Sequence, residues 1–174
     1  MAGPCACVYL PTSIDASVID AVRNTCASIS DTVEGDDFWV TSTISIYGRY
    51  TGEGRPFILT VNDASDELGD DVELFEDALG WRPQLAVGFA AMCNQQQDHQ
   101  ILAELCVFVC RRFGGVITMH GDFDLICRNR EFRSQFFSHS GVATVVYDDD
   151  SREHLMSDEL LELWMDHPEF RMLK

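Results

Sequence analysis

The sequence predicts an α+β fold in which a single layer of mainly antiparallel sheet is covered by helices. Segments of strand-like composition gather in two groups, and segments with helical periodicity are interspersed among them. The chain has 174 residues, 46% of them hydrophobic and 24% charged, which is typical of one globular domain. We therefore expect a single domain over residues 1–174, with a core that needs neither a metal nor a disulfide.

The first strand and the first helix are predicted near the start of the chain. Residues 6–10 form a short apolar run that indicates a buried strand, and Pro11 ends it. The hydroxyl of Thr12 or Ser13 can accept a hydrogen bond from a first-turn amide, so either is expected to cap a helix. Apolar residues at helical spacing then predict one buried stripe. They are Ile14, Val18, Val22, Cys26 and Ile29.

A hairpin and an acidic segment are predicted next. Residues 38–47 are rich in β-branched and aromatic side chains, which favour a strand. Glycine and proline over 48–56 predict a hairpin connection into a second strand at 57–61. The acidic stretch 62–77 has apolar residues three or four positions apart, so we expect part of it to be a short helix that ends at Gly80.

The longest predicted helix follows an apolar strand over residues 85–92. Asn94 and Gln97 have the spacing of a capping box at its start, and Gly114 is placed to end it. The apolar residues between them define a wide buried face. They are Ile101, Leu102, Leu105, Phe108, Val109 and Phe113.

Two more strands and a final helix are predicted towards the end of the chain. Residues 116–125 and 141–147 have strand-like composition, and 127–140 is expected to connect them. Ser157 can cap the last helix, which must end near Asp166 because a proline follows.

The charge is the most unusual property of the chain. It has 29 Asp and Glu against 12 Lys and Arg, a formal net charge of −17. Direct binding to nucleic acid or to an anionic membrane requires the opposite balance, so we expect neither. The expected macromolecular partner is a basic protein. The simpler interpretation is that the acidity only keeps the protein soluble.

The sequence also indicates a cytoplasmic location and reduced thiols. We see no signal peptide and no apolar run approaching the roughly 20 residues that cross a bilayer. Cys106 and Cys110 lie four residues apart on the long predicted helix, but zinc sites usually draw on two close pairs, and Cys5 with Cys7 makes a poor second pair. We interpret the thiols as mostly buried. The seven cysteines are Cys5, Cys7, Cys26, Cys93, Cys106, Cys110 and Cys127.

Two small groups of polar residues are candidates for chemistry. His120, Asp122 and Asp124 alternate, so on a strand they would share one face and could ligate a divalent ion. We interpret them instead as the solvated face of a half-buried strand. Asp98 and His99 at the head of the long helix are a candidate acid–base pair, but no nucleophile motif accompanies them, and a structural role is preferred.

No motif predicts a cofactor. The glycines between residues 48 and 54 lack the lysine and the spacing of a phosphate-binding loop, so we expect no cofactor and no metal. Arginines alternate with phenylalanines in one segment, as in a small nucleic-acid patch. In so acidic a protein we expect these arginines to pair with its own carboxylates. The residues are Arg128, Phe132, Arg130, Arg133, Phe136 and Phe137.

Two acidic tracts, 63–77 and 148–169, are the strongest functional signal. Such runs are usually solvated, but together with nearby tryptophans they can form the charged rim and the aromatic anchors of an interface. A carboxylate surface also speeds encounter with cationic partners. The candidate partner-binding residues are Asp63, Asp66, Glu67, Asp70, Asp71, Glu73, Glu76, Asp77, Trp81, Asp148, Asp149, Asp150 and Trp164.

Several segments resemble a known family. They are Cys93-Asn94, the run DHQILAEL at 98–105, RFGGVI at 112–117 and WMDHPEFRMLK at 164–174. Together they resemble a bacterial, largely actinobacterial, family of short acidic proteins that is known only as a domain of unknown function. The resemblance implies no activity. In size and charge, such proteins are similar to the immunity proteins of toxin systems, which is an analogy of class and not of motif.

The leading hypothesis is a non-enzymatic binding protein, most specifically a cytoplasmic immunity or inhibitor protein that blocks a basic toxin or nuclease. One alternative is a small hydrolase or metal-dependent enzyme that uses His99, His120 and Asp122. A second alternative is a DNA mimic whose carboxylates take the place of phosphates.

Overall fold

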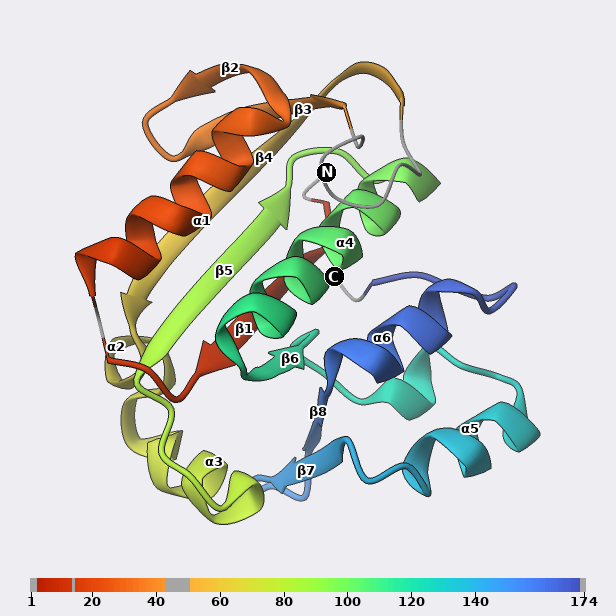
Figure 1. Ribbon diagram of the computed structural model, residues 1–174. Coiled ribbons are helices and arrows are strands. Elements are labelled where there is room, and N and C mark those ends of the chain that lie inside the picture. Colours follow the sequence, from red (N-terminus) through yellow and green to blue (C-terminus); the bar gives the residue numbers. More distant parts are fainter. Residues whose placement is uncertain (1–2, 14, 43–50, 173–174) are drawn as a thin grey trace.

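The computed structural model, drawn in Figure 1, describes residues 3–13, 15–42 and 51–172. Its centre is an eight-stranded sheet with the order β2-β3-β4-β5-β1-β6-β8-β7. All neighbouring strands run antiparallel, and the predicted α+β fold class is confirmed. The strands are β1 (Cys5–Leu10), β2 (Ser30–Glu34), β3 (Asp37–Ser42), β4 (Thr51–Asp63), β5 (Leu85–Ala91), β6 (Val116–Thr118), β7 (Val142–Val146) and β8 (Arg152–Met156). The helices are α1 (Ala16–Ser28), α2 (Ala64–Leu68), α3 (Val72–Leu79), α4 (Gln96–Phe113), α5 (Arg130–Phe137) and α6 (Asp158–Met165), with short 3-10 turns η1 (Gly69–Asp71) and η2 (Phe123–Leu125).

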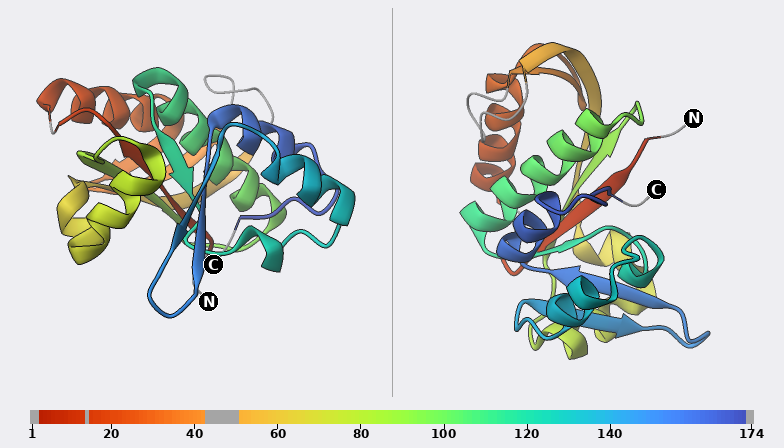
Figure 2. Two further views of the ribbon diagram at one scale, coloured as in Figure 1. Left: turned by 90° about the horizontal axis from the view of Figure 1, so that it is seen from below. Right: turned by 90° about the vertical axis from the view of Figure 1, so that its right-hand side faces the viewer.

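The main core lies between one face of the sheet and the helices α1, α4 and α6, which share one side of the strands (Figure 2). β1 lies between β5 and β6 and directs Ala6, Val8 and Leu10 into this core. The predicted apolar face of α4 points inward, with Ile101 and Leu105 buried. The hydrophobic stripe read from the sequence therefore positions the longest helix on the central strand.

A second, smaller core lies on the opposite face of the sheet, under α2 and α3. The rings of Tyr9 on β1 and Phe75 on α3 meet edge to face, with their centroids 5.2 Å apart. Alternation along the strands supplies Cys7, Ala86, Val145 and Leu155 to this face, and α2 supplies Ala64. The sheet thus carries helices on both faces, and α3 lies against β7.

Helix α1 begins later than predicted. Its N-cap is Asp15, whose carboxylate accepts a hydrogen bond from the Ser17 amide at 2.8 Å. The predicted caps Thr12 and Ser13 are wrong, because a carboxylate nearer the first buried residue takes that place. Ile14 lies outside the described residues.

The start of α4 also differs from the prediction. Gln95 and Asp98 form the capping box, one residue later than the predicted pair Asn94 and Gln97. The buried Asp98 carboxylate accepts from the Gln95 amide at 2.6 Å, and from Arg55 of β4 at 2.7 and 2.6 Å. The long-range partner on β4 fixes which residue caps the helix, and nothing local in the sequence shows it.

Other predicted helix ends are confirmed. Gly80 ends α3 in a left-handed conformation with φ of 73°, which glycine adopts without steric strain. Gly114 ends α4 with φ of 71°. The hydroxyl of Ser157 accepts from the Leu160 amide at the start of α6, and Asp166 is the C-cap of that helix.

The predicted strand over 116–125 is wrong beyond Thr118. The chain leaves the sheet there, passes through His120 with φ of 55°, and then forms η2. The predicted connection 127–140 contains α5, whose apolar residues pack on η2 and α6. Strands β2 and β8 were not predicted. Residues 43–50 of the predicted hairpin lie outside the described residues, and 51–56 belong to β4.

The carboxy-terminal segment is fixed to the start of α4 by two hydrogen bonds. The Met172 amide donates to Nδ1 of His99 at 3.0 Å, and Nε2 of Gln96 donates to the Phe170 carbonyl at 3.1 Å. This attachment gives His99 a structural role.

Candidate functional site

The first acidic tract, 63–77, folds into α2, η1 and α3. Asp63 is the N-cap of α2, and hydrogen bonds from the hydroxyl and amide of Ser65 lower the pKa of this carboxyl. Glu76 pairs with Arg82 at 2.9 Å. The other carboxylates form no ion pair with any cationic side chain that the structure describes. They are Asp66, Glu67, Asp70, Asp71, Glu73 and Asp77.

The second acidic tract divides into two parts. Its first three aspartates, 148–150, are exposed on the turn between β7 and β8. Hydrogen bonds from Ser151 lower the pKa of Asp149, which favours the ionised form of this carboxyl. Farther along, two carboxylates of α6 pair with Arg111 at 2.8 Å each. The three aspartates of the turn form no ion pair with a described cationic side chain, whereas two of the three carboxylates of α6 do.

The fold brings the two tracts together, although they are far apart in the sequence. A hollow of about 500 Å³ lies between the start of α3 and the β7–β8 turn. Asp71 and Leu74 line it from one side, and Tyr147, Asp148, Asp149 and Ser151 line it from the other. We call this surface the acidic face. It comprises the lining aspartates Asp71, Asp148 and Asp149, together with their exposed chain neighbours Asp70 and Asp150.

The two tryptophans differ in their surroundings. Trp164 is fully buried, its indole ring meets Phe123 edge to face at 5.0 Å, and its Nε1 donates to the Arg171 carbonyl at 3.0 Å. It is a core residue, so the prediction that it anchors a partner is wrong. Trp81 is half-buried against the smaller core, with part of its surface open to solvent.

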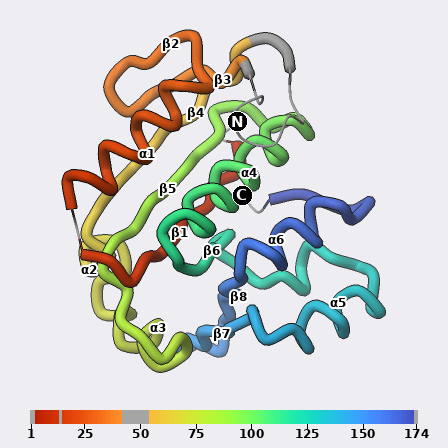
Figure 3. Tube along the Cα trace, viewed as in Figure 1, coloured from red at the N-terminus to blue at the C-terminus, as the bar shows by residue number. Residues whose placement is uncertain are grey.

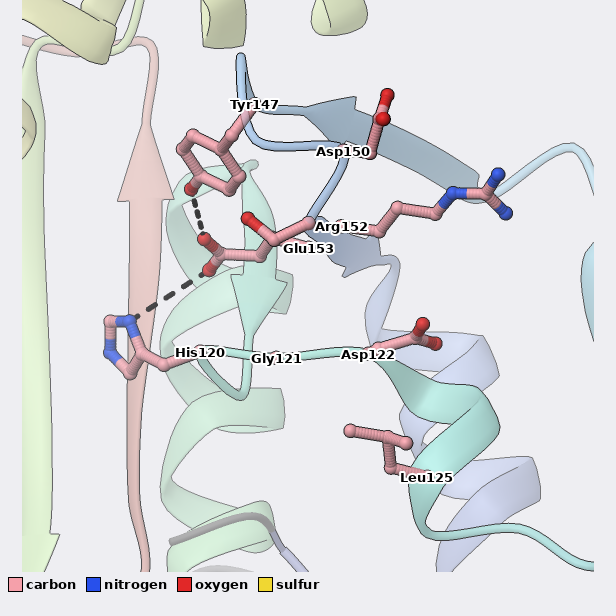
Figure 4. Close-up of a pocket in the computed structure, with 9 residues that line it drawn as sticks. His120, Gly121, Asp122, Leu125, Tyr147, Asp150, Arg152 and Glu153 are labelled. Carbon is pink, nitrogen blue, oxygen red and sulfur yellow. Dashed lines mark hydrogen bonds and ion pairs between the residues drawn. The ribbon is translucent and has the colours of Figure 1, made fainter.

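A second hollow, of about 670 Å³, lies on the other side of the β7–β8 turn (Figure 4). Glu153 is buried beside it and accepts hydrogen bonds from the hydroxyls of Thr118 and Tyr147, the latter at 2.5 Å. Nδ1 of His120 lies 3.8 Å from this carboxylate. Figure 4 shows the Arg152 side chain directed away from Glu153. We call this hollow the Glu153 pocket.

Sequence reasoning did not find Tyr147, Glu153 or Thr118. These residues come from three separate segments, and Glu153 lies on the unpredicted strand β8. Tyr147 links the two hollows, because it lines both. Burial raises the pKa of Tyr147, and its hydrogen bond to Glu153 and the charge of Asp71 raise it further.

The alternating residues His120, Asp122 and Asp124 do not lie on a strand. Because β6 ends at Thr118, the three side chains do not share a strand face. Asp122 caps η2 by accepting from the Asp124 amide at 2.8 Å, and Asp124 pairs with Arg133 at 3.1 Å. Within residues 3–13, 15–42 and 51–172, no group of three His, Cys, Asp or Glu is arranged to hold a metal ion. The interpretation of these residues as the solvated face of a half-buried strand is therefore wrong, because the chain has left the sheet before His120.

The cysteines have the environment of packing residues. All seven are free thiols. Burial raises the pKa of Cys106 well above its ordinary value, and it raises the pKa of Cys110 to about 11. Cys110 also donates to the Gly115 carbonyl. Such thiols are protonated at neutral pH, and a protonated thiol is a poor nucleophile.

The segment of arginines and phenylalanines contributes Phe136 to the core, and the partly buried Phe132 packs against it. Phe136 is buried and stacks on Phe123 with the ring centroids 3.9 Å apart, and Phe132 contacts Trp164. Arg133 pairs with an aspartate, as expected from the sequence. The buried ring of Phe136 is not available to stack on a nucleic-acid base.

The family described as "Family of unknown function (DUF6368)" matches residues 2–174 of the chain. No curated protein and no solved structure matches the chain. None of the described helices has the length and apolarity needed to cross a membrane.

Proposed function

We propose, from the premise that this chain belongs to the DUF6368 family of unknown function, that it is a non-enzymatic acidic binding protein. Its specific role is that of a cytoplasmic immunity or inhibitor protein. It binds a basic toxin or nuclease and covers the cationic surface with which that partner binds its own substrate.

The acidic face is the observation that carries this proposal. Asp71 and Asp148, which are 77 positions apart in the chain, line one hollow. No cationic side chain in the described part of the chain pairs with the five carboxylates of the acidic face. Acidity that served solubility alone would not need to be concentrated around a concave surface. Concentrated charge of one sign accelerates encounter with an oppositely charged protein.

The structural roles of the other candidates support a binding function over a catalytic one. His99 holds the carboxy-terminal segment, and Asp122 caps a 3-10 turn. Neither His99 nor any cysteine lines the Glu153 pocket, which His120 and Asp122 line. The residues suggested for a hydrolase thus have separate structural roles, and they do not line one common pocket.

Binding kinetics across a salt series test the proposal. The partner is first captured from a lysate, and its association rate is then measured with the double variant Asp70→Lys/Asp71→Lys and the triple variant Asp148→Lys/Asp149→Lys/Asp150→Lys. Exposed charges are screened beyond about 8 Å at physiological ionic strength, so association of the unchanged protein should slow as salt is added. At least one variant should associate more slowly and lose most of that salt dependence.

A matched control separates the acidic face from net charge. Asp20 on α1 and Glu34 on β2 are exposed and lie outside the acidic face, so Asp20→Lys/Glu34→Lys changes the net charge by the same amount as the Asp70/Asp71 variant. If the control slows association as much as the acidic-face variants, or if neither face variant alters the rate, the proposal is wrong.

A further inference from the structure

The two edges of the sheet, β2 and β7, are built differently. An edge strand presents backbone N–H and C=O groups that lack a neighbour, and proteins usually guard them with charges, prolines or bulges. β2 carries exposed Asp31 and Glu34, and its pairing with β3 has a register shift. β7 has the sequence VATVV, with no charge and no proline, and its pairing with β8 is regular.

The hydrogen bonds around β8 show which groups of β7 face outward. The Tyr147 amide donates to Ser151, and the Ser157 amide donates to Gly141, so residues 141, 143, 145 and 147 face β8. Backbone groups of alternate residues point to opposite sides of a strand. The N–H and C=O groups of Thr144 and Val146 therefore point to the outer edge.

The side chains at this edge are open to solvent as well. Thr144 is exposed, and Val146 keeps 51% of its surface exposed. Val142, at the other end of the strand, is partly buried, and its amide already donates to the His139 carbonyl. The free edge thus extends from Thr144 to Val146 and continues directly into the aspartates of the β7–β8 turn.

We infer that the outer edge of β7 docks an extended segment of the basic partner, which pairs with Thr144 and Val146 as an added strand. This inference rests on the proposed function. Strand addition gains affinity from backbone hydrogen bonds and specificity from alternate side chains. The segment that fits has apolar or β-branched side chains beside Val146 and lysine or arginine beside Asp148. A second copy of this chain fits less well, because two chains with a formal charge of −17 repel each other.

A synthetic peptide tests the edge directly. It has about seven residues, the length of an ordinary strand, alternates valine with threonine and ends in lysines. Amide hydrogen exchange, followed by NMR, should slow at least tenfold at Thr144 and Val146 when the peptide is added. Exchange at Ala143 and Val145 should change little, because these amides already face β8.

Two matched controls isolate the backbone contribution. The same peptide, N-methylated at alternate amides, keeps its charge and side chains but loses donors, so it should bind at least about tenfold more weakly. In the protein, Thr144→Pro removes an outward N–H, whereas Thr144→Val keeps it. Only the proline variant should lose peptide binding, with circular dichroism checking that it folds.

Several outcomes would overturn the inference. The inference is wrong if the N-methylated peptide binds as tightly as the unmethylated one. It is also wrong if the Thr144 and Val146 amides are already protected in the free protein because the chain self-associates, which sedimentation would detect. If acidic-face reversals slow association with the captured partner but peptide binding leaves both amides unprotected, the proposed function stands and the edge inference fails. Protection at the edge without any effect of charge reversal would instead remove the proposed function.

Discussion

The phenolic hydroxyl of Tyr147 donates a hydrogen bond of 2.5 Å to the carboxylate of Glu153, from one end of the β7–β8 turn to the other. The turn that carries Asp148, Asp149 and Asp150 is therefore closed by a polar contact to a buried group, in addition to the pairing of the two strands. The acidic face and the Glu153 pocket share this contact, so its loss should affect both.

Tyr147→Phe should lower the free energy of unfolding by about 1.5–3 kcal/mol, the range for a hydrogen bond to a charged group. The reason is that the Glu153 carboxylate loses a donor while it stays buried. Urea unfolding followed by circular dichroism measures the change. The control is Val146→Ala, at the exposed neighbouring residue, which should lower the free energy of unfolding far less. Equal losses would show that the hydroxyl contributes nothing specific.

Trp164→Ala should destabilise the fold by about 3–5 kcal/mol, since a fully buried aromatic ring leaves a cavity when it is removed. Trp81→Ala should cost less, because that ring is only half-buried. The same urea titration compares them. A Trp164→Ala protein as stable as the unchanged chain would contradict the core position of this ring.

Asp98→Asn should cost about 3–5 kcal/mol, because it leaves the Arg55 guanidinium largely buried beside a neutral group. The matched control is Asp158→Asn, which removes one partner of the exposed Arg111 and should cost about 1 kcal/mol or less. Thermal unfolding of both variants provides the comparison. Similar unfolding midpoints for the two variants would mean that the buried pair of Arg55 and Asp98 contributes no more to stability than the exposed pair of Arg111 and Asp158.

His154 should make stability fall as the pH falls below 6.5. Burial lowers the pKa of His154, which Asp122 only partly offsets, and Nδ1 accepts a hydrogen bond from the Phe123 amide at 3.1 Å. The unfolded chain then binds the proton more readily than the folded chain, so acid favours unfolding below the ordinary value of about 6.5. The check is the free energy of unfolding between about pH 7.5 and 5.5.

Removal of the histidine tests this assignment. His154→Gln should flatten the profile over this range. A slope that survives His154→Gln would assign the effect to other groups.

The elements predicted correctly are those whose burial follows a regular period. The stripe of α4 and the Ser157 cap of α6 were visible in the sequence because local spacing determines them. Strand β2 was not, because an edge strand with four exposed residues shows no apolar alternation. Strand β8 was missed because it buries Glu153 and His154, and charged or titratable residues do not mark a buried strand.

The candidate site was predicted in part. The acidic residues of both tracts were identified from composition, but their meeting depends on α3 packing against β7, a contact that has no local signal. Trp164 was misassigned, although Leu160 and Leu161, four and three residues earlier, share its buried helical face and could have indicated a core position. The Glu153 pocket could not be predicted, because its residues come from three segments that only the folded chain brings together.

The place of β1 in the sheet has a consequence for synthesis on the ribosome. β1 emerges early, yet its two neighbours are β5 (Leu85–Ala91) and β6 (Val116–Thr118), as the trace in Figure 3 shows. Among the residues that the structure describes, its strand partners follow only after more than 70 further residues have been translated, and closing such long loops is slow. In nascent chains stalled before residue 85, β1 should therefore remain sensitive to protease, and it should become protected only once β5 has left the exit tunnel.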